Sequence, residues 1–363
     1  MAGDGLPQPV GRNGVNPGPD GAAGGGRPQP SGQGVGTPEP EAATVLEGSG
    51  LRKHFRIAGM LSRDRHKVVR AVDGVDLAIR RGSTLGLVGE SGCGKSTVGR
   101  LLLRLLEPSA GIIRLGGEDI TAARGRELRS LRARMQIVFQ DPFASLNGRW
   151  RVGDILAAPF RIHGSVEKGE VRSRVSELLR RVGLSEADAR KFPHEFSGGQ
   201  RQRIGIARAL ALEPEVIVCD EPVSALDVSV QAQVINLLRD LQRELGVSYL
   251  FISHDLAVVE NISREVAVMY LGRIVEQAPR DRLFDSPRHP YTQALLEAVP
   301  RTDAARRDRR HRPRIAGEVP SAVDPPGGCP FHPRCSIAEP ECRTVPPPLG
   351  PRPDGRILAC HLR

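Results

Sequence analysis

The sequence predicts an α/β fold, and three observations lead to that prediction. Short apolar runs alternate with amphipathic segments from about residue 50 to about residue 300, which is typical of strands and helices in a layered domain. The apolar run Thr84–Val88 leads directly into a glycine-rich turn. Residues Val228–Leu245 carry apolar side chains at helical spacing, and Gly246 follows as a helix C-cap.

The composition favours a folded chain with appended segments. The chain has 363 residues, of which 39% are hydrophobic and 26% are charged, enough for a sizeable core. No apolar stretch reaches the roughly 18 residues of a membrane-spanning helix, and the N-terminus lacks a signal-peptide pattern. The net charge of +10 has two explanations: an arginine-rich coding bias, or an anionic partner such as a nucleotide, a lipid headgroup or a nucleic acid.

Residues 89–97 fit the phosphate-loop pattern G-x-x-x-x-G-K-[ST]. The predicted strand Thr84–Val88 precedes this loop, and a predicted helix at 98–106 follows it. In such a loop, backbone N–H groups and the positive end of the helix bind phosphates. Lys95 reaches the β and γ oxygens, and the Ser96 hydroxyl ligates Mg²⁺. The alternative is a tight glycine turn with a surface lysine. The predicted ATP-binding residues here are Gly89, Glu90, Ser91, Gly92, Cys93, Gly94, Lys95, Ser96 and Thr97.

A second motif is the apolar run Val216–Asp220 followed by Glu221. An aspartate at the end of a strand beside a phosphate loop holds Mg²⁺ through water, and the next acid orients or deprotonates an attacking water. Such a pair of acids alone is common at strand ends and usually structural. After a phosphate loop, the pair predicts a P-loop nucleoside triphosphatase.

Residues 196–203 read FSGGQRQR and come before a predicted helix at 204–212. This stretch resembles the LSGGQ signature of the ATP-binding cassette (ABC) superfamily, with Phe196 in place of Leu. The alternative is a flexible glycine turn. The resemblance implies a RecA-like ABC nucleotide-binding domain with a helical subdomain at about 145–210. It also implies that the signature of one subunit closes on ATP held by another. The signature residues are Ser197, Gly198, Gly199 and Gln200.

Three further motifs, namely the Q-loop, the D-loop and the switch histidine, match this superfamily in the expected order. Gln140 matches the Q-loop glutamine, which reaches Mg²⁺ and the attacking water, so the resemblance implies Mg²⁺ binding by Ser96, Gln140 and Asp220. His254 matches the switch histidine. Phe55 is the candidate for stacking on adenine, with a core phenylalanine or His66 as alternatives. The D-loop residues are Ser224, Ala225, Leu226 and Asp227.

The chain is most similar to the ATPase subunits of oligopeptide and dipeptide importers. Residues 140–147 (QDPFASLN) resemble the Q-loop region of that family, and residues 219–233 (CDEPVSALDVSVQAQ) resemble its F-type ATPase. Gly148 departs from the family, where Pro is common. Residues 289–292 (HPYT) match the start of the C-terminal extension of the family. This resemblance divides the chain into a disordered tail at 1–48, a nucleotide-binding domain at 49–285 and an extension at 286–363.

The resemblance also implies an activity and partners. The expected activity is ATP hydrolysis coupled to peptide uptake. The expected partners are a D-type ATPase in a heterodimer (or a second copy as fallback), two transmembrane permease subunits and, indirectly, an extracytoplasmic solute-binding protein. The expected location is the cytoplasmic face of the inner membrane, as a peripheral subunit. Alternatives are an importer ATPase for nickel or another small solute, a soluble ABC ATPase acting on nucleic acid or ribosomes, and a P-loop kinase. We expect no nucleic acid.

The extension contains four cysteines without the CxxC spacing of a common zinc site: Cys329, Cys335, Cys342 and Cys360. Some members of the family carry a [4Fe–4S] cluster on four such cysteines, which implies one here. Zinc, free thiols and a disulfide are the alternatives, with His332 and His361 as alternate ligands. We expect this module to be separate from the core that carries the phosphate loop.

Overall fold

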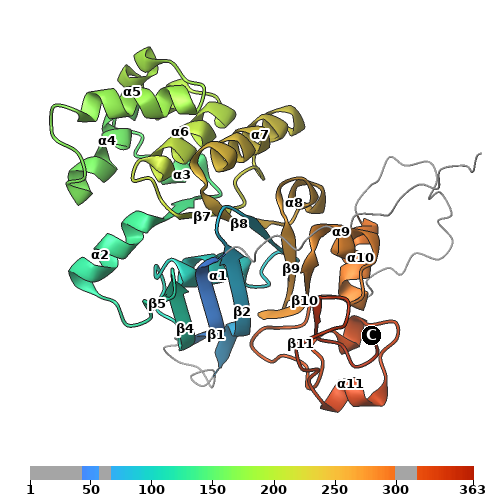
Figure 1. Cartoon of the computed structure of the whole chain (residues 1–363). Helices are drawn as coiled ribbons and strands as arrows, with labels where there is room; N and C mark the ends of the chain where they lie inside the picture. Colours follow the sequence, from blue (N-terminus) through green and yellow to red (C-terminus); the bar gives the residue numbers. More distant parts are fainter. Residues whose placement is uncertain (1–42, 57–66, 299–316) are drawn as a thin grey trace, which may run out of the picture. The chain divides into compact units, whose positions relative to one another are not determined.

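The computed structural model describes residues 43–56, 67–298 and 317–363 (Figure 1). The predicted disordered tail, residues 1–48, lies outside the described residues except for 43–48. The described part confirms the α/β prediction, with two sheets and a group of helices.

The larger sheet, as described, has eight strands, and its centre is parallel. The central strands are fully buried, as expected where helices cover both faces of a parallel sheet. The four strands at one end of the sheet, β11, β12, β10 and β9, pair antiparallel. The strands, in order across the sheet, are β11 (Gly350–Pro351), β12 (Ile357–Leu358), β10 (Arg273–Pro279), β9 (Glu265–Tyr270), β3 (Thr84–Val88), β8 (Ser248–Ser253), β7 (Val216–Asp220) and β6 (Met135–Val138).

The smaller sheet is antiparallel and begins earlier than predicted. Its strands, in order, are β2 (Val68–Arg80), β1 (Thr44–Arg56), β4 (Ala110–Leu115) and β5 (Glu118–Asp119). The predicted domain start at residue 49 is therefore too late, because Val45 and Leu46 are fully buried in the core of this sheet. Two apolar residues beside a polar tail are too weak a signal to mark a strand.

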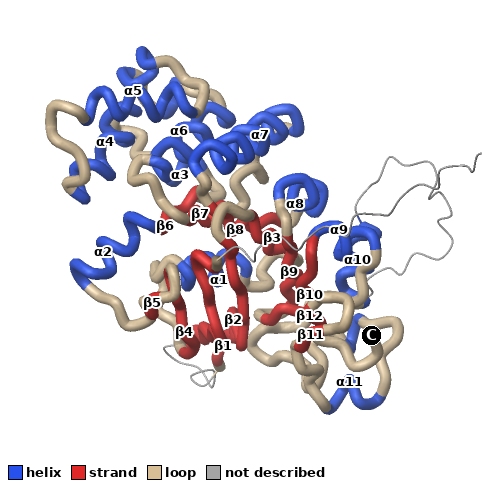
Figure 2. Tube along the Cα trace, viewed as in Figure 1, coloured by secondary structure: helices blue, strands red, loops and turns tan. Residues whose placement is uncertain are grey.

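The helices of the predicted subdomain lie together, in blue at the top of Figure 2. In α5, Val175, Leu178 and Leu179 are buried and form the apolar stripe of an amphipathic helix. The elements within 142–210 are α3 (Pro142–Ser145), α4 (Val152–His163), α5 (Val171–Arg181), η1 (Glu186–Arg190), η2 (Pro193–Glu195) and α6 (Gly198–Leu210). The other helices are α1 (Lys95–Leu102), α2 (Gly125–Arg134), α7 (Val228–Leu245), α8 (Leu256–Ile262), α9 (Arg280–Asp285), α10 (Pro290–Ala298), η5 (His332–Arg334) and α11 (Pro340–Thr344).

The C-terminal extension does not have a core of its own. Its strand β12 pairs with β10 and so extends the main sheet. Phe331 packs against Tyr270 and Tyr291, with ring centroids 5.3 and 5.4 Å away. Arg356 and Glu276, both buried, form an ion pair of 2.8 Å. The expectation of a module separate from the phosphate-loop core is therefore wrong.

His289 is buried at this junction as a neutral side chain. Its Nδ1 accepts a hydrogen bond of 3.1 Å from the backbone N–H of Tyr291. Burial lowers the pKa of His289 from 6.5 to about 4, and the backbone hydrogen bond with Ala359 opposes this only in part. The imidazole therefore belongs to the packed interior.

The low pKa of His289 predicts how stability depends on pH. Its folded pKa lies below its unfolded value, so its contribution is complete above about 6.5 and is lost as pH falls toward about 4. Between those limits the free energy of unfolding of the full chain should fall by roughly 3 kcal/mol through this residue alone. Urea unfolding at several pH values measures the loss. His289→Gln should flatten the pH dependence, whereas His194→Gln at an exposed site should not. An equally steep fall in His289→Gln would contradict the assignment.

Candidate functional site

The phosphate loop lies between β3 and α1 and presses against two neighbouring strands. Gly89 and Gly94 have φ angles of 154° and 109°, which side-chain-bearing residues rarely adopt. A Cβ at Gly94 would lie 2.1 Å from the carbonyl oxygen of Ala71, and one at Gly89 would lie 2.2 Å from that of Met269. Both glycines are therefore required by the close approach of backbone as well as by φ.

Lys95 lies across this loop. Its side chain donates hydrogen bonds of 2.8 and 3.0 Å to the carbonyl oxygens of Gly89 and Glu90, and the residue is only 5% exposed. A buried cation is costly unless anionic or polar groups surround it. This position suits the lysine for contact with the phosphates of a bound nucleotide.

Ser96 joins the phosphate loop to the end of β7. Its hydroxyl donates a hydrogen bond of 2.7 Å to Oδ1 of Asp220. Burial raises the pKa of Asp220, while the Ser96 hydrogen bond and the charges of Arg100 and Lys95 oppose that effect. A hydroxyl and a carboxylate are hard oxygen donors, the type that Mg²⁺ uses together with substrate phosphates. The donor set therefore fits Mg²⁺.

Three predicted catalytic residues from distant parts of the sequence meet at Glu221. Gln140 donates a hydrogen bond of 2.7 Å from Nε2 to Glu221 Oε2. Nδ1 of His254 lies 3.3 Å from Glu221 Oε1. The backbone N–H of Glu221 donates a hydrogen bond of 3.0 Å to the carbonyl of Ile252 in β8. The structure thus brings together the three side chains that were predicted to be catalytic.

Glu221 also has an unusual backbone conformation. Its φ is 48°, in the left-handed region that costs a non-glycine residue roughly 1–3 kcal/mol. The carboxylate turns out of the strand direction at the edge of the sheet, immediately after Asp220. The two neighbouring acids therefore contact different partners. Asp220 contacts the phosphate loop, whereas Glu221 contacts Gln140 and His254.

The signature sequence begins α6, and its glycines serve close packing. Ser197 accepts a hydrogen bond of 3.3 Å from the N–H of Gln200, whose side-chain oxygen accepts one of 3.0 Å from Ser197 N–H. This reciprocal capping box fixes the helix start. A Cβ at Gly199 would lie 2.4 Å from Cγ1 of Val230, so Gly199 allows α6 to approach α7.

The D-loop presents an exposed surface beside Glu221. Asp227 caps α7 by accepting a hydrogen bond of 3.0 Å from the N–H of Val230, and its hydrogen bond from Ser229 lowers the pKa of the carboxyl. Ser224, Ala225 and Asp227 are exposed, and Leu226 is half-buried. Val228 follows with 81% of its surface exposed.

Phe55 lies near the end of β1, opposite Val69. It is 39% exposed, and Lys53 Nζ lies 5.3 Å from its ring centroid. The alternative of a core phenylalanine is therefore wrong, whereas adenine stacking stays a prediction. The rival His66 lies outside the described residues.

The four cysteines of the extension do not form a metal-ligand set as placed. Cys329 donates its N–H to the carbonyl of Cys342 at 2.8 Å. Burial raises the pKa of the Cys329 thiol to about 11, to which the other three thiols add. Within residues 43–56, 67–298 and 317–363, no three His, Cys, Asp or Glu side chains are grouped to hold a metal ion. The structure therefore does not support the predicted [4Fe–4S] cluster.

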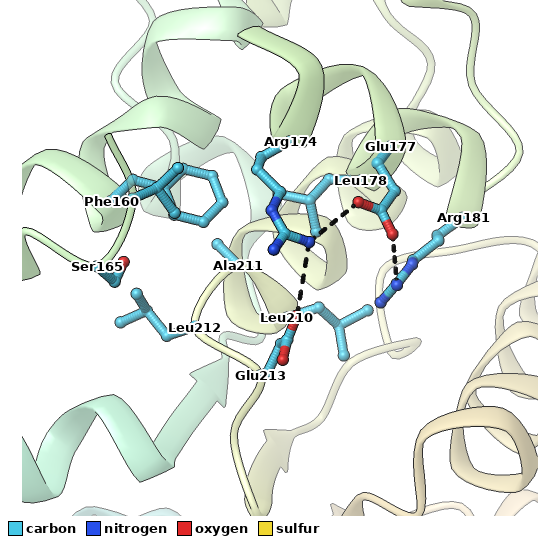
Figure 3. A pocket seen from close by; sticks show the side chains of 11 residues that line it. Phe160, Ser165, Arg174, Glu177, Leu178, Arg181, Leu210, Ala211, Leu212 and Glu213 are labelled. Carbon is cyan, nitrogen blue, oxygen red and sulfur yellow. Dashed lines mark hydrogen bonds and ion pairs between the residues drawn. The ribbon is translucent and has the colours of Figure 1, made fainter. Parts of the chain in front are cut away.

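A pocket of about 160 Å³ lies in the helical region, apart from these residues (Figure 3). Arg174 lies 3.3 Å from Glu177 and 3.9 Å from Glu213, and Arg181 also pairs with Glu177. Two arginines and two glutamates leave the pocket without a net charge. None of the predicted site residues lines it, so we do not assign it a ligand.

Sequence reasoning missed two residues that contact the phosphate loop and a third that contacts one of them. Arg334 pairs with Glu90, Tyr270 lies beside that pair, and Tyr291 accepts a hydrogen bond from the Glu90 N–H. Tyr291 falls in the HPYT motif, which signalled only the start of the extension. Arg334 has no local pattern that links it to a loop 244 positions away.

Two family models match the chain. "ABC transporter" matches residues 72–224, and "Oligopeptide/dipeptide transporter, C-terminal region" matches residues 275–342. No helix of the described residues is long and apolar enough to cross a membrane.

Curated relatives match over most of the chain. The oligopeptide transport ATP-binding protein AppF of Bacillus subtilis is 51% identical over 320 residues, which cover 88% of this chain and 97% of the relative. The dipeptide transport ATP-binding protein DppF of Escherichia coli is 49% identical over 317 residues, covering 87% and 93%.

Solved structures of ABC cassettes share the fold. The protein cbiO1 of Clostridium perfringens, part of an ABC transporter complex, matches with a TM-score of 0.58 and 30% identity over 67% of this chain and 92% of its own. A dimeric cassette bound to ADP and phosphate matches with a TM-score of 0.58 and 26% identity over 65% and 98%. The loop geometry, the family models and these relatives together show the family. The chain belongs to the ABC transporter family as one of its peptide-transport ATP-binding proteins.

Proposed function

We propose that this chain is the ATP-hydrolysing subunit of a peptide importer and couples ATP binding and hydrolysis at the cytoplasmic face to uptake through permease subunits. The observation that carries the proposal is the position of Glu221. It contacts both Gln140 and His254, and it follows the aspartate that Ser96 contacts. The names of the curated relatives support peptides as the solute, over nickel and over nucleic acid.

The proposed reaction uses each side chain in a defined role. Lys95 and the loop N–H groups bind the β- and γ-phosphates. Ser96, Asp220 and Gln140 would hold Mg²⁺, and a bound Mg²⁺ would supply positive charge to offset the charge that develops on the phosphates. Glu221 accepts a proton from the attacking water, and Gln140 and His254 orient that carboxylate. The family resemblance implies that His254 contacts the γ-phosphate, and its contact with Glu221 supports that role.

The signature completes the site across an interface between two cassettes. The glycines at the N-terminus of α6 offer N–H groups to a phosphate, and α6 packs on α3, α4, α5, α7 and β6. The exposed D-loop and Val228 support a second cassette on this surface. Because the chain resembles an F-type subunit, we propose a D-type ATPase as that partner, with a second copy of this chain as the fallback.

The remaining partners follow from the family. We propose that two transmembrane permease subunits recruit the pair of cassettes to the cytoplasmic face of the inner membrane. An extracytoplasmic solute-binding protein then delivers the peptide to the permease. The chain would act there as a peripheral subunit.

Replacing the proposed base separates ATP binding from hydrolysis. Glu221→Gln should lower the ATPase rate of the assembled complex by roughly 10²- to 10⁴-fold, because the amide cannot accept the proton. Binding of ATP should persist, measured with a fluorescent ATP analogue. Glu244→Gln, at an exposed position on α7, is the matched control and should hydrolyse at the wild-type rate. Near-normal turnover of Glu221→Gln would remove Glu221 from this role.

We also propose that the four cysteines hold a [4Fe–4S] cluster. The support is their placement in one small module, where the N–H of Cys329 donates a hydrogen bond of 2.8 Å to the carbonyl of Cys342. Their described positions are not those of cluster ligands, so the thiols would have to turn toward one another. No step of ATP hydrolysis depends on this cluster.

Metal analysis tests the cluster. Full-length protein purified without oxygen should contain stoichiometric iron and sulfide and absorb broadly near roughly 400 nm. Cys342→Ser should lose most of the iron, whereas Cys219→Ala, outside the module, should keep it. Stoichiometric zinc without iron, or four freely alkylated thiols, would refute the proposal.

A further inference from the structure

The C-terminal extension reaches the phosphate loop through one side chain. Arg334 forms two parallel hydrogen bonds to the carboxylate of Glu90, of 2.9 Å from Nη1 and 3.0 Å from Nη2. The Arg334 side chain is only 6% exposed. Nη1 also donates a hydrogen bond of 3.4 Å to the hydroxyl of Tyr270. A buried, bidentate pair of this kind is both directional and strong.

The same glutamate is held at its two backbone groups. Its N–H donates a hydrogen bond of 2.9 Å to the hydroxyl of Tyr291. Its carbonyl oxygen accepts a hydrogen bond of 3.0 Å from Nζ of Lys95. The position of Glu90 therefore affects the position of the lysine that would contact the phosphates. Arg334 controls the third attachment, that of the side chain.

The charge of Glu90 gives the pair a second effect. A carboxylate inside a loop that binds a polyphosphate repels the ligand unless a cation compensates it. Arg334 supplies that cation from a buried position, where screening by solvent is weak. Burial would lower the pKa of Arg334, but its hydrogen bonds to Glu90 and Tyr270 and the charge of Glu90 outweigh that effect and raise it. The arginine is therefore always charged.

The extension is built to keep Arg334 in place. Arg334 ends η5, whose preceding residue Phe331 packs against Tyr270 and Tyr291. The N–H of Arg334 donates a hydrogen bond of 3.0 Å to the carbonyl of Phe331. Of these two rings, Tyr270 also contacts Arg334 and Tyr291 also contacts Glu90. The η5 turn and the phosphate loop therefore pack against the same two tyrosines.

We propose that Arg334 is a positioning residue for the phosphate loop, through which the C-terminal extension sets the affinity for the phosphates of ATP. The inference rests on the proposed nucleotide site at residues 89–97. It is independent of the transported solute. Its effect acts through Glu90, so it should depend on the charge of that residue.

A double-mutant cycle tests this dependence in the full chain, with a fluorescent ATP analogue as the probe. Arg334→Ala should raise the dissociation constant by about tenfold. In a Glu90→Gln background, the same substitution should change it by less than about threefold, because no carboxylate remains to compensate. In steady-state assays of the assembled complex, Arg334→Ala should raise KM more than it lowers kcat. Arg343→Ala, exposed in the same module, is the control and should bind as wild type.

Two outcomes would overturn the proposal: an unchanged dissociation constant in Arg334→Ala, or an equally large effect in the Glu90→Gln background. If Arg334→Ala does not fold, as judged by thermal unfolding, Arg334→Lys replaces it. That variant keeps the charge and loses the bidentate geometry, so its defect should be smaller and still depend on Glu90. Lys95→Ala separates the two levels of inference, because unchanged binding in Lys95→Ala would refute the nucleotide site itself.

Discussion

The hydrogen bond between Ser96 and Asp220 is the contact on which the rest of the site depends. It joins the start of α1 to the end of β7, two elements that are 124 positions apart. Because Glu221 follows Asp220 directly, this bond also fixes the distance between the phosphate loop and the proposed base. A hydrogen bond to a charged group contributes roughly 1.5–3 kcal/mol, enough to hold the start of α1 against the end of β7. Gln140 and His254 then act on a carboxylate whose place is already set.

The surrounding fold holds the phosphate loop and Glu221 in fixed positions and leaves the D-loop surface exposed. Three parallel strands, β3, β7 and β8, are buried along their whole length, so the loops that follow them start from fixed points. The glycines at 89 and 94 let β9 and β2 pack directly against the phosphate loop. By contrast, the D-loop and Val228 face outward. The half of the site made by the loop and Glu221 is therefore assembled within one chain, whereas the signature belongs to a different surface.

Much of this arrangement could be predicted from sequence because it is encoded locally. The strand Thr84–Val88 and the helix Val228–Leu245 have the predicted bounds, since buried runs, apolar periodicity and a glycine cap are short-range signals. The meeting of Gln140, Glu221 and His254 was implied only by the family resemblance, because no spacing rule brings three loops together.

Other features depend on long-range packing that the sequence does not reveal. Strands β11 and β12 are two residues long and become strands only because β10 offers an edge. The ion pair between Arg334 and Glu90 is one example. Arg334 is one of many arginines in the extension, and Glu90 occupies a position of the phosphate-loop motif where any residue is allowed. The early start of β1 is a similar case, since burial of Val45 depends on the sheet around it.

The central claim is that a complete ATP site requires the phosphate loop of one chain and the signature of another. The most direct measurement is the ATPase activity of a linked pair of copies in which one carries Ser197→Arg and the other Lys95→Ala. One composite site then contains both defects and the other contains neither, so activity should return relative to pairs in which both copies carry the same substitution. Absence of any recovery in verified mixed pairs would contradict the claim and place each complete site within a single chain.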